Sequence, residues 1–318
     1  DLIALNQYLA YQFITDHKSI YKDVKKLPPA HYMRVGFYGE IKEINSYWQF
    51  DFRPNYSYSE NDWLEALEET IKESVNAHLV SDVPFGAFLS GGIDSSLVVG
   101  YMAQLMEDPV KTFCIGFEEK GYSELEYARK VARYWGTDHH ESVVKPDALA
   151  ILPDLVNHYG EPFGDSSAIP TYYVSQLARQ HVTMALSGDA GDELFAGYQS
   201  YSYNWSKHLS SVPEHLAFYK RMPYRLLNVV FPNKYPLRSA TLSDWQQYIN
   251  YYGLKERNQL WKPELAIHLD QTDNDYQDIW KYSQSFGHFQ KVQYLDFRTY
   301  LPYDILTKVD VASMMNSL

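Results

Sequence analysis

Short apolar runs alternate with segments of helical periodicity between residues 85 and 188, and this alternation restricts the fold more than any other feature of the sequence. Apolar runs lie at 85–89, 110–117 and 181–188, and HHESVV (139–144) is expected to be a further strand. Helices are expected at 63–78, 95–106, 123–136, 147–158 and 168–180. Strands that are separated by helices form parallel sheets, because a parallel pair needs a crossover connection. The sequence therefore predicts an α/β fold, a parallel sheet with helices on both faces.

The flanking regions have a different pattern. Residues 1–57 are predicted to be the end of one unit, with a helix, a hairpin that turns at Gly36–Gly39, and an aromatic linker at 49–59. After residue 197 the strand signal stops, and a largely helical C-terminal half is expected. Its Tyr-, Trp- and Leu-rich segments are MPYRLLNVVFP, DWQQYINYYG and FQKVQYLDFRTYLP. The chain starts with Asp and is expected to be part of a longer protein.

Composition excludes several partners. The formal net charge of -12 argues against a nucleic acid or an anionic membrane surface, which need clustered Lys and Arg. No run of apolar residues is long enough to predict a membrane span, and no signal peptide is apparent. The single cysteine, Cys114, rules out an intramolecular disulfide and predicts a cytoplasmic location.

Two polar loops, each directly after an apolar run, contain most of the candidate ligand-binding residues. They are SGGIDSS (90–96), directly after Leu89, and SGDAGDE (187–193), directly after Leu186. Open α/β sheets bind ligands beyond the carboxyl ends of their strands. In the first loop, Gly91 and Gly92 allow close backbone approach, and the N–H groups of the next helix favour an anion. The loop lacks the Lys of a Walker A motif, so it suits pyrophosphate better than transfer of a γ-phosphate.

The acidic residues of these loops need a cation if the ligand is an anion. Asp94 and Asp192 are predicted to hold Mg2+ between them, because Mg2+ takes one or two carboxylates together with phosphate oxygens. Each loop has a simpler interpretation, a Ser N-cap for SGGIDSS and a surface Asp-Gly turn for SGDAGDE. Their joint position at two strand ends favours a site. Cys114 is interpreted as a core thiol, and His139 and His140 as solvent or core residues.

At these residues the chain resembles the glutamine-dependent asparagine synthetase family, in its synthetase domain. The PP-loop signature SGGxDSS of N-type ATP pyrophosphatases is present at 90–96, and LSGDAGDELFAGY at 186–198 matches a second signature. KTFCIGF (111–117), GEPFGDSSAIPTYYVS (160–175) and LPYDILTKVDVASM (301–314) match three further family segments. LPPAHYMRV and NSYW resemble the end of the family's glutaminase domain, so the predicted domains are 1–57, a glutaminase remnant with linker, and 58–318, the synthetase domain.

The resemblance implies an adenine nucleotide α-hydrolase-like fold and ATP-dependent amide synthesis. Aspartate would be activated as an acyl-adenylate, with release of pyrophosphate, and ammonia from glutamine would then displace AMP. The implied ATP-binding residues are Leu89, Ser90, Gly91, Gly92, Asp94, Ser95, Ser96, Ile115, Ser187 and Gly188. The resemblance places Asp189 at the intermediate, as the catalytic residue. The resemblance implies that most of the glutaminase domain, including its N-terminal cysteine nucleophile, lies outside this sequence. A catalytic Lys is expected beyond Leu318, and a homodimer is one option for assembly.

Two departures from the family pattern concern the acceptor, the carboxylate substrate that receives the ammonia nitrogen. Asp189 stands where other members carry Glu, and Ser166 and Ser167 replace a stretch that contains Thr and Arg. A related amidotransferase acting on a sugar acid or closing a β-lactam is therefore an alternative. A non-catalytic nucleotide-binding relative is a third interpretation, against which the intact Ser90, Asp94 and Asp192 argue.

Overall fold

The structure, a computed structural model, divides the chain into two compact units. It describes residues 1–15, 17–50, 52, 57–118, 123–145, 148–202, 241–265 and 271–318. One unit comprises Asp1–Phe52 and Glu193–Tyr303, and the other comprises Arg53–Asp192 and Asp304–Leu318. We call them the helical unit and the sheet unit.

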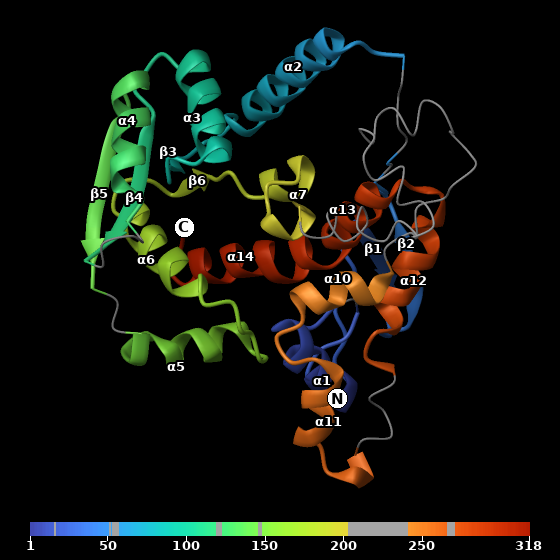
Figure 1. Cartoon of the computed structure of the whole chain (residues 1–318). Helices are drawn as coiled ribbons and strands as arrows, with labels where there is room; N and C mark the ends of the chain where they lie inside the picture. The colour runs from blue at the N-terminus through green and yellow to red at the C-terminus, as the bar shows by residue number, and fades with distance from the viewer. Residues whose placement is uncertain are drawn as a thin grey trace, which may run out of the picture. The chain divides into compact units, whose positions relative to one another are not determined.

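The sheet unit is built on four parallel strands (Figure 1). They are β3 (Phe85–Phe88), β4 (Lys111–Phe117), β5 (Asp138–Val144) and β6 (Met184–Leu186), in the order β5-β4-β3-β6. All three neighbouring pairs are parallel, which confirms the predicted sheet. β6 is shorter than the apolar run at 181–188 that predicted it.

Helices pack on both faces of this sheet, as the alternation predicts. The helices of the sheet unit are α2 (Glu60–His78), α3 (Ile93–Leu105), α4 (Leu125–Trp135), α5 (Ala148–Tyr159), α6 (Ala168–Arg179) and α14 (Leu306–Met314). Successive residues of β4 point to opposite faces. Cys114 is buried in a cluster with Val99 of α3 and Ala128 of α4, whereas Phe113 is buried against Ala178 of α6.

Local signals explain two of the helix ends in the sheet unit. Ser59 caps α2 through a reciprocal pair of hydrogen bonds with Asp62, so this helix starts before the predicted Trp63. α4 ends at Gly136, whose φ of 65° is the left-handed conformation that glycine adopts most readily. α3 begins at Ile93, two residues before the predicted Ser95.

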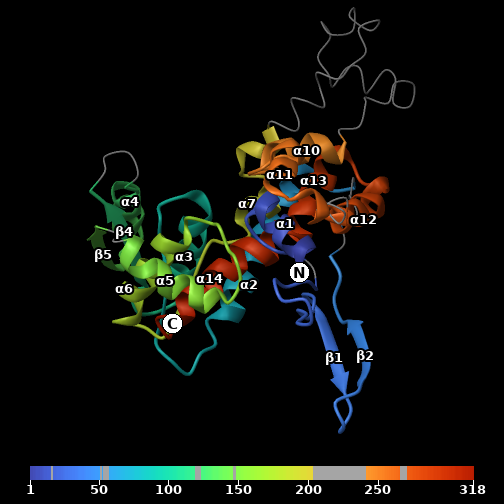
Figure 2. The same ribbon diagram turned by 90° about the horizontal axis from the view of Figure 1, so that it is seen from below.

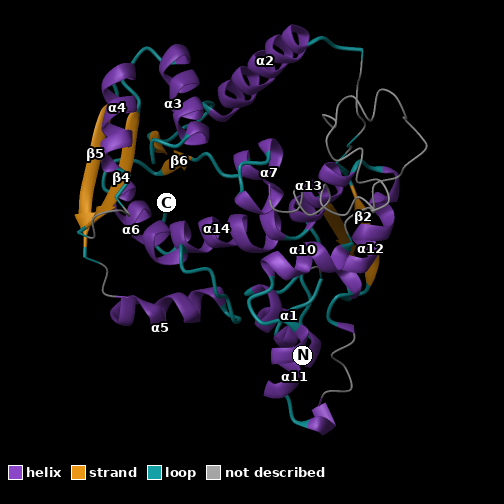
Figure 3. Cartoon of the chain, viewed as in Figure 1, coloured by secondary structure: helices purple, strands orange, loops and turns teal. Residues whose placement is uncertain are grey.

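The helical unit confirms the largely helical C-terminal half over the residues that are described. Its helices are α1 (Leu2–Tyr11), α10 (Leu242–Ile249), α11 (Leu254–Leu260), α12 (Asn274–Tyr282), a short 3-10 turn (Ser283–Ser285) and α13 (His288–Arg298). Two short segments cross the boundary between the units, α7 (Gly191–Phe195) and a π-helical turn (Leu301–Ile305). In the described residues after β6, Figure 3 shows helices and loops and no strand. The expectation for MPYRLLNVVFP falls outside the described residues, as do residues 51 and 53–56 of the predicted linker at 49–59.

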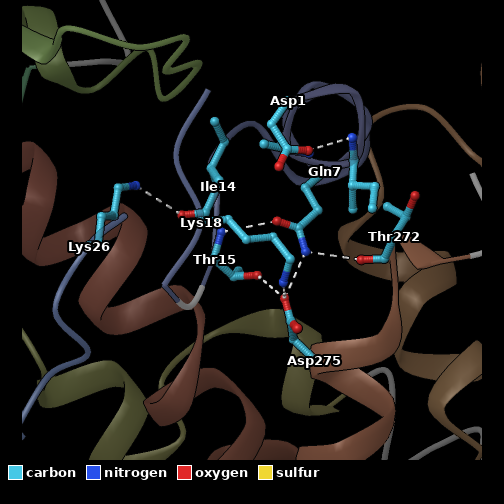
Figure 4. A network of polar contacts seen from close by, with 10 residues as sticks. Asp1, Gln7, Ile14, Thr15, Lys18, Lys26, Thr272 and Asp275 are labelled. Carbon is cyan, nitrogen blue, oxygen red and sulfur yellow. Dashed lines mark hydrogen bonds and ion pairs between the residues drawn. The ribbon is translucent and has the colours of Figure 1, made fainter. Parts of the chain in front are cut away.

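A buried polar network fastens the N-terminal segment within the helical unit (Figure 4). The amide of Gln7 donates to the Thr272 carbonyl at 3.0 Å and to the Asp275 carboxylate at 2.9 Å. Thr15 and Lys18 bind the same carboxylate oxygen of Asp275. Gln7 is fully buried, so each of these bonds satisfies a group that would be costly to leave unpaired.

The hairpin predicted around Gly36–Gly39 is present. β1 (His31–Val35) pairs antiparallel with β2 (Ile41–Ser46), and Gly39 in the turn has φ 87°. Figure 2 shows that the hairpin projects from the helices of its own unit. Most of its side chains are exposed, including those of Phe37 and Tyr38 at the turn.

No helix among the described residues combines the length and the apolar character that crossing a membrane requires.

Candidate functional site

The two polar loops leave the same edge of the sheet. β3 and β6 are parallel neighbours, with Phe85 opposite Met184 and Ala87 opposite Leu186. The segment SGGIDSS follows β3, and SGDAGDE follows β6. The structure thus brings the two loops together at the carboxyl ends of adjacent strands, as the sequence predicts.

Two glycines of the second loop allow the loops to touch. A Cβ atom at Gly188 would lie 2.7 Å from the backbone nitrogen of Ser95. A Cβ atom at Gly191 would lie 2.5 Å from Cγ of Asp94. At Gly188 a side chain would meet backbone atoms that cannot rotate away, whereas at Gly191 it would force the Asp94 side chain to move. Gly188 is among the predicted site residues, but Gly191 is not, and its position within SGDAGDE is the only sequence signal for it.

Hydrogen bonds hold the first loop in a closed turn. The hydroxyls of Ser90 and Ser95 share a hydrogen bond of 3.0 Å, and the Gly92 amide donates to Ser90 Oγ at 3.2 Å. Gly91 has φ 84°, and a Cβ there would lie 2.5 Å from the Ala128 nitrogen of α4. Leu89 precedes the turn and is buried, with its amide bonded to the Phe113 carbonyl.

The amino end of α3 matches an anion-binding turn better than a Ser-capped one. Its N-cap is Gly92, and no side chain accepts a hydrogen bond from the first turn. The interpretation of SGGIDSS as a plain Ser N-cap is therefore wrong. The exposed amino end keeps its N–H groups and its positive dipole for a ligand. Ser96 in the same turn has a buried hydroxyl without a hydrogen-bond partner.

Acidic side chains crowd the junction of the loops. Burial raises the pKa of the Asp192 carboxyl above its usual range, and the nearby charges of Asp94 and Asp189 raise it further. Mutual repulsion of this kind is what a divalent cation relieves, and two carboxylates fit Mg2+ when phosphate oxygens complete the coordination. Among the described residues, no group of three or more His, Cys, Asp or Glu is arranged to hold a metal by itself. The pair Asp94 and Asp192 thus fits an ion that a nucleotide brings with it.

The second loop has a strained backbone beside an exposed carboxylate. The Ser187 hydroxyl donates to Asp189 Oδ2 at 2.6 Å, and Asp189 is exposed. Ala190, the next residue, has φ 76°, a left-handed conformation that costs a non-glycine residue about 1–2 kcal/mol. Such strain concentrates at functional sites, because it persists only where the surroundings impose it.

The other sequence candidates lie on the sheet itself. Ile115 is half-buried on β4. His140 stacks on the ring of His181, with ring centroids 3.9 Å apart, and His139 Nδ1 lies 2.9 Å from Thr112 Oγ1. These contacts agree with packed strand histidines.

Cys114 is a buried thiol, and we expect it to be chemically inert. Burial, with smaller effects from Glu124 and Glu141, raises the pKa of the Cys114 thiol to about 12. At pH 8, about one thiol in ten thousand would then be ionised. Iodoacetamide should therefore leave Cys114 unmodified in the folded protein at pH 8 and label it after unfolding, as mass spectrometry would show. Release of glutamate from glutamine that disappears in Cys114→Ala would contradict this prediction.

Comparisons with known proteins identify relatives of this chain. The family model described as asparagine synthase matches residues 66–318. The chain is 34% identical to glutamine-hydrolyzing asparagine synthetase 1 of Bacillus subtilis, over all of this chain and 50% of that protein. It is 38% identical to a putative glutamine-hydrolyzing asparagine synthetase of Methanocaldococcus jannaschii, over 80% of this chain and 46% of that protein. The amidase chyE of Penicillium rubens is 29% identical over 63% of this chain and 32% of its own length. The chain spans about half the length, or less, of these curated relatives.

Proposed function

The chain belongs to the asparagine synthase family, and we propose that it supplies the synthetase part of an ATP-dependent ligase that converts aspartate into asparagine. The observation that carries this proposal is the contact between the two loops. A Cβ at Gly188 would clash with the backbone of Ser95, and one at Gly191 would clash with Asp94, so the loops approach too closely for a side chain at either position. The amino end of α3 and the pair Asp94 and Asp192 therefore lie close together.

In the proposed reaction, a carboxylate oxygen of aspartate attacks the α-phosphorus of ATP. The bond from that phosphorus to pyrophosphate breaks, and an acyl-adenylate forms. The nitrogen of ammonia then attacks the acyl carbon, AMP leaves with the bonding electron pair, and the nitrogen gives up a proton to solvent. Splitting the substitution in this way replaces hydroxide, a poor leaving group, with pyrophosphate and AMP.

The residues of the site take separate roles in this scheme. The turn from Ser90 to Ser96 would receive the phosphates through N–H and O–H donors, because the amino end of α3 carries no side-chain cap. Leu89 and Ile115 would adjoin the adenosine, Leu89 through its backbone because its side chain is buried in the core. Ser187 and Gly188 complete the proposed nucleotide contacts. Asp94 and Asp192 would hold Mg2+, which when bound neutralises phosphate charge.

We also infer that residues 1–57 are the end of a glutaminase-type domain and that 58–318 form the synthetase domain. The exposure of the β1–β2 hairpin supports this division, because an isolated two-stranded hairpin is marginal in water. The names of the bacterial and archaeal relatives include glutamine hydrolysis, which supports glutamine as the source of ammonia. A reducing, cytoplasmic location fits the lone buried thiol. The homodimer stays a prediction.

A second candidate is amidation of a carboxylate other than aspartate. This candidate is retained because Asp189 is one methylene shorter than the Glu of other members and accepts a hydrogen bond from the Ser187 hydroxyl. ATP–pyrophosphate exchange in the full-length protein separates the candidates. Exchange that depends on aspartate supports asparagine synthesis, and exchange with only a sugar acid or a β-lactam precursor supports the second candidate. No exchange with any carboxylate, together with normal Mg-ATP binding, would indicate a non-catalytic relative.

Asp189→Ala is expected to slow aspartate-dependent exchange far more than it weakens Mg-ATP binding. The reason is that Asp189 is exposed at the tip of its loop, where the proposal places the intermediate, whereas Asp94 and Asp192 serve the phosphates. Measuring the Kd of Mg-ATP and the exchange rate for the same variant tests this. Asp82→Ala, at an exposed carboxylate before β3, is the control and should change neither quantity. An equal loss of both in Asp189→Ala would place this residue in the nucleotide or metal site.

A further inference from the structure

Two family segments outside the nucleotide loops meet in a buried ion pair within the sheet unit. Lys308 Nζ lies 3.0 Å from Asp165 Oδ2, and their side chains are only 10% and 16% exposed. Asp165 belongs to the loop 160–167, which precedes α6, and Lys308 lies in the first turn of α14. Neither residue is among the site residues that the sequence predicts.

The pair is part of a larger attachment of the loop to α14. Asp165 also accepts hydrogen bonds from the Ser167 amide at 2.8 Å and from the Ser167 hydroxyl at 2.7 Å. The Tyr159 hydroxyl donates to the Lys308 carbonyl at 3.2 Å, and its ring stacks on Phe163 with planes 4° apart. Both ends of the loop are thereby fixed to one turn of helix.

Stability alone does not explain a buried pair of charges. Removing two charges from water costs about as much as their attraction returns, and apolar replacements of similar size are often neutral or stabilising. Asp304 adds a second negative charge close to this pair. Burial is the main cause that raises the pKa of Tyr159, and the charges of Asp165 and Asp304 raise it further. What the pair does provide is a single geometry, because a charge left without its partner here would be strongly unfavourable.

This geometry is imposed at the edge of the sheet where the proposed site lies. α6 leads into β6, and a helix that connects parallel strands runs opposite to them. The amino end of α6, and with it the loop 160–167, therefore lies at the carboxyl edge, as do the SGGIDSS and SGDAGDE loops. α6 and α14 pack side by side (Figure 1), and Asn316 Nδ2 donates to the Tyr172 carbonyl at 3.1 Å between them.

We propose that Asp165 and Lys308 are positioning residues for the acceptor carboxylate, which fix the loop 160–167 as one wall of its subsite without touching it. The inference rests on the proposed function, since it assigns a wall to the acceptor site of that reaction. If the inference holds, affinity for the acceptor depends on the ion pair between Asp165 and Lys308 of α14, and affinity for the nucleotide does not. A purely structural pair would affect the stability of the unit and leave the KM for the acceptor unchanged.

The test uses the full-length protein and the double variant Asp165→Asn/Lys308→Met, which removes both charges and keeps similar volumes. The matched control is Lys111→Met/Asp138→Asn, which removes a half-exposed pair of 2.8 Å at the start of β4 and β5. We expect the KM for the acceptor to rise about tenfold, which corresponds to a loss of about 1.4 kcal/mol of acceptor binding free energy. The Kd of Mg-ATP and kcat at saturating acceptor should stay at the wild-type values. The control should change none of the three.

Each outcome decides between the proposals. A folded double variant with a wild-type KM for the acceptor overturns the inference, as does an equal loss of nucleotide affinity. If the double variant does not fold, Lys308→Arg keeps the charge and lengthens the arm. It should raise the same KM by a smaller factor, and an unchanged KM overturns the inference. A wild-type protein that shows no carboxylate-dependent exchange overturns the proposed function and this inference with it, whereas an active wild type with an unaffected variant overturns the inference alone.

Discussion

Replacement of Asp94 by Asn is expected to weaken binding of Mg-ATP and of magnesium pyrophosphate while AMP still binds. Asn keeps the shape of the side chain and removes its charge, so the loss should be on the order of 1–3 kcal/mol for a charged contact. AMP lacks the phosphates that a shared ion would bridge, so its affinity should not depend on Asp94. Calorimetry with the three ligands measures all of these quantities.

The companion experiment asks whether Asp94 and Asp192 serve one ion. The pKa of Asp192 is raised by burial and then by the charge of Asp94, so the charge of Asp94 acts on Asp192. If they share a cation, Asp94→Asn/Asp192→Asn should cost less than the sum of the single variants. Asp82→Asn, an exposed carboxylate before β3, serves as the control. Additive losses, or normal Mg-ATP binding by Asp94→Asn, would mean that the loops do not share a metal.

The sheet and the meeting of its two loops were predictable because both follow from local patterns. A buried parallel strand is a short apolar run, and parallel strands carry their following loops to one edge. Leu89 and Leu186 each end such a run and are each followed by Ser-Gly. The order β5-β4-β3-β6 makes the two strands neighbours, which places the loops side by side.

The starting point of α3 shows where local reasoning fails. Pattern reading places the helix start at Ser95, because serine is a frequent cap and Gly a weak one. The structure begins α3 at Ile93 with Gly92 as the N-cap, and the hydroxyl of Ser95 bonds to Ser90. The turn is thus shaped by contacts across the loop, and a departure from the ordinary capping rule at a ligand-binding turn is expected.

Long-range contacts could not be predicted either, because they too depend on residues that are not neighbours in the sequence. Asp165 and Lys308 sit in segments that are far apart in the sequence, and nothing in either segment names its partner. The attachment of Asp1–Phe52 to Glu193–Tyr303 is a second case. There, Gln7 and Asp275 bond at 2.9 Å, although a buried amide and a helix-start carboxylate carry no pattern that pairs them.

Gly188→Ala should abolish most nucleotide binding although it adds only a methyl group. The new Cβ would lie 2.7 Å from the Ser95 nitrogen and 3.0 Å from the Asp94 carbonyl carbon. Both atoms belong to the backbone, so no side chain can rotate out of the way and the loops must separate. Overpacking of this kind costs about 1–3 kcal/mol of stability. Because the amides of the α3 turn must move with the backbone, Mg-ATP affinity should fall by about tenfold or more, a loss of at least about 1.4 kcal/mol of binding free energy.

Gly136→Ala provides the matched control for this effect. Gly136 ends α4 with φ 65°, and a Cβ there would meet no atom within 4 Å. A left-handed alanine costs about 1–2 kcal/mol, so both variants should lose similar stability in thermal unfolding. Only Gly188→Ala should lose Mg-ATP binding, because only there does the added atom separate the two loops. If Gly188→Ala folds and binds Mg-ATP as the wild type does, the nucleotide must bind away from the junction of the loops, and the assignment of Ser187 and Gly188 to the nucleotide fails.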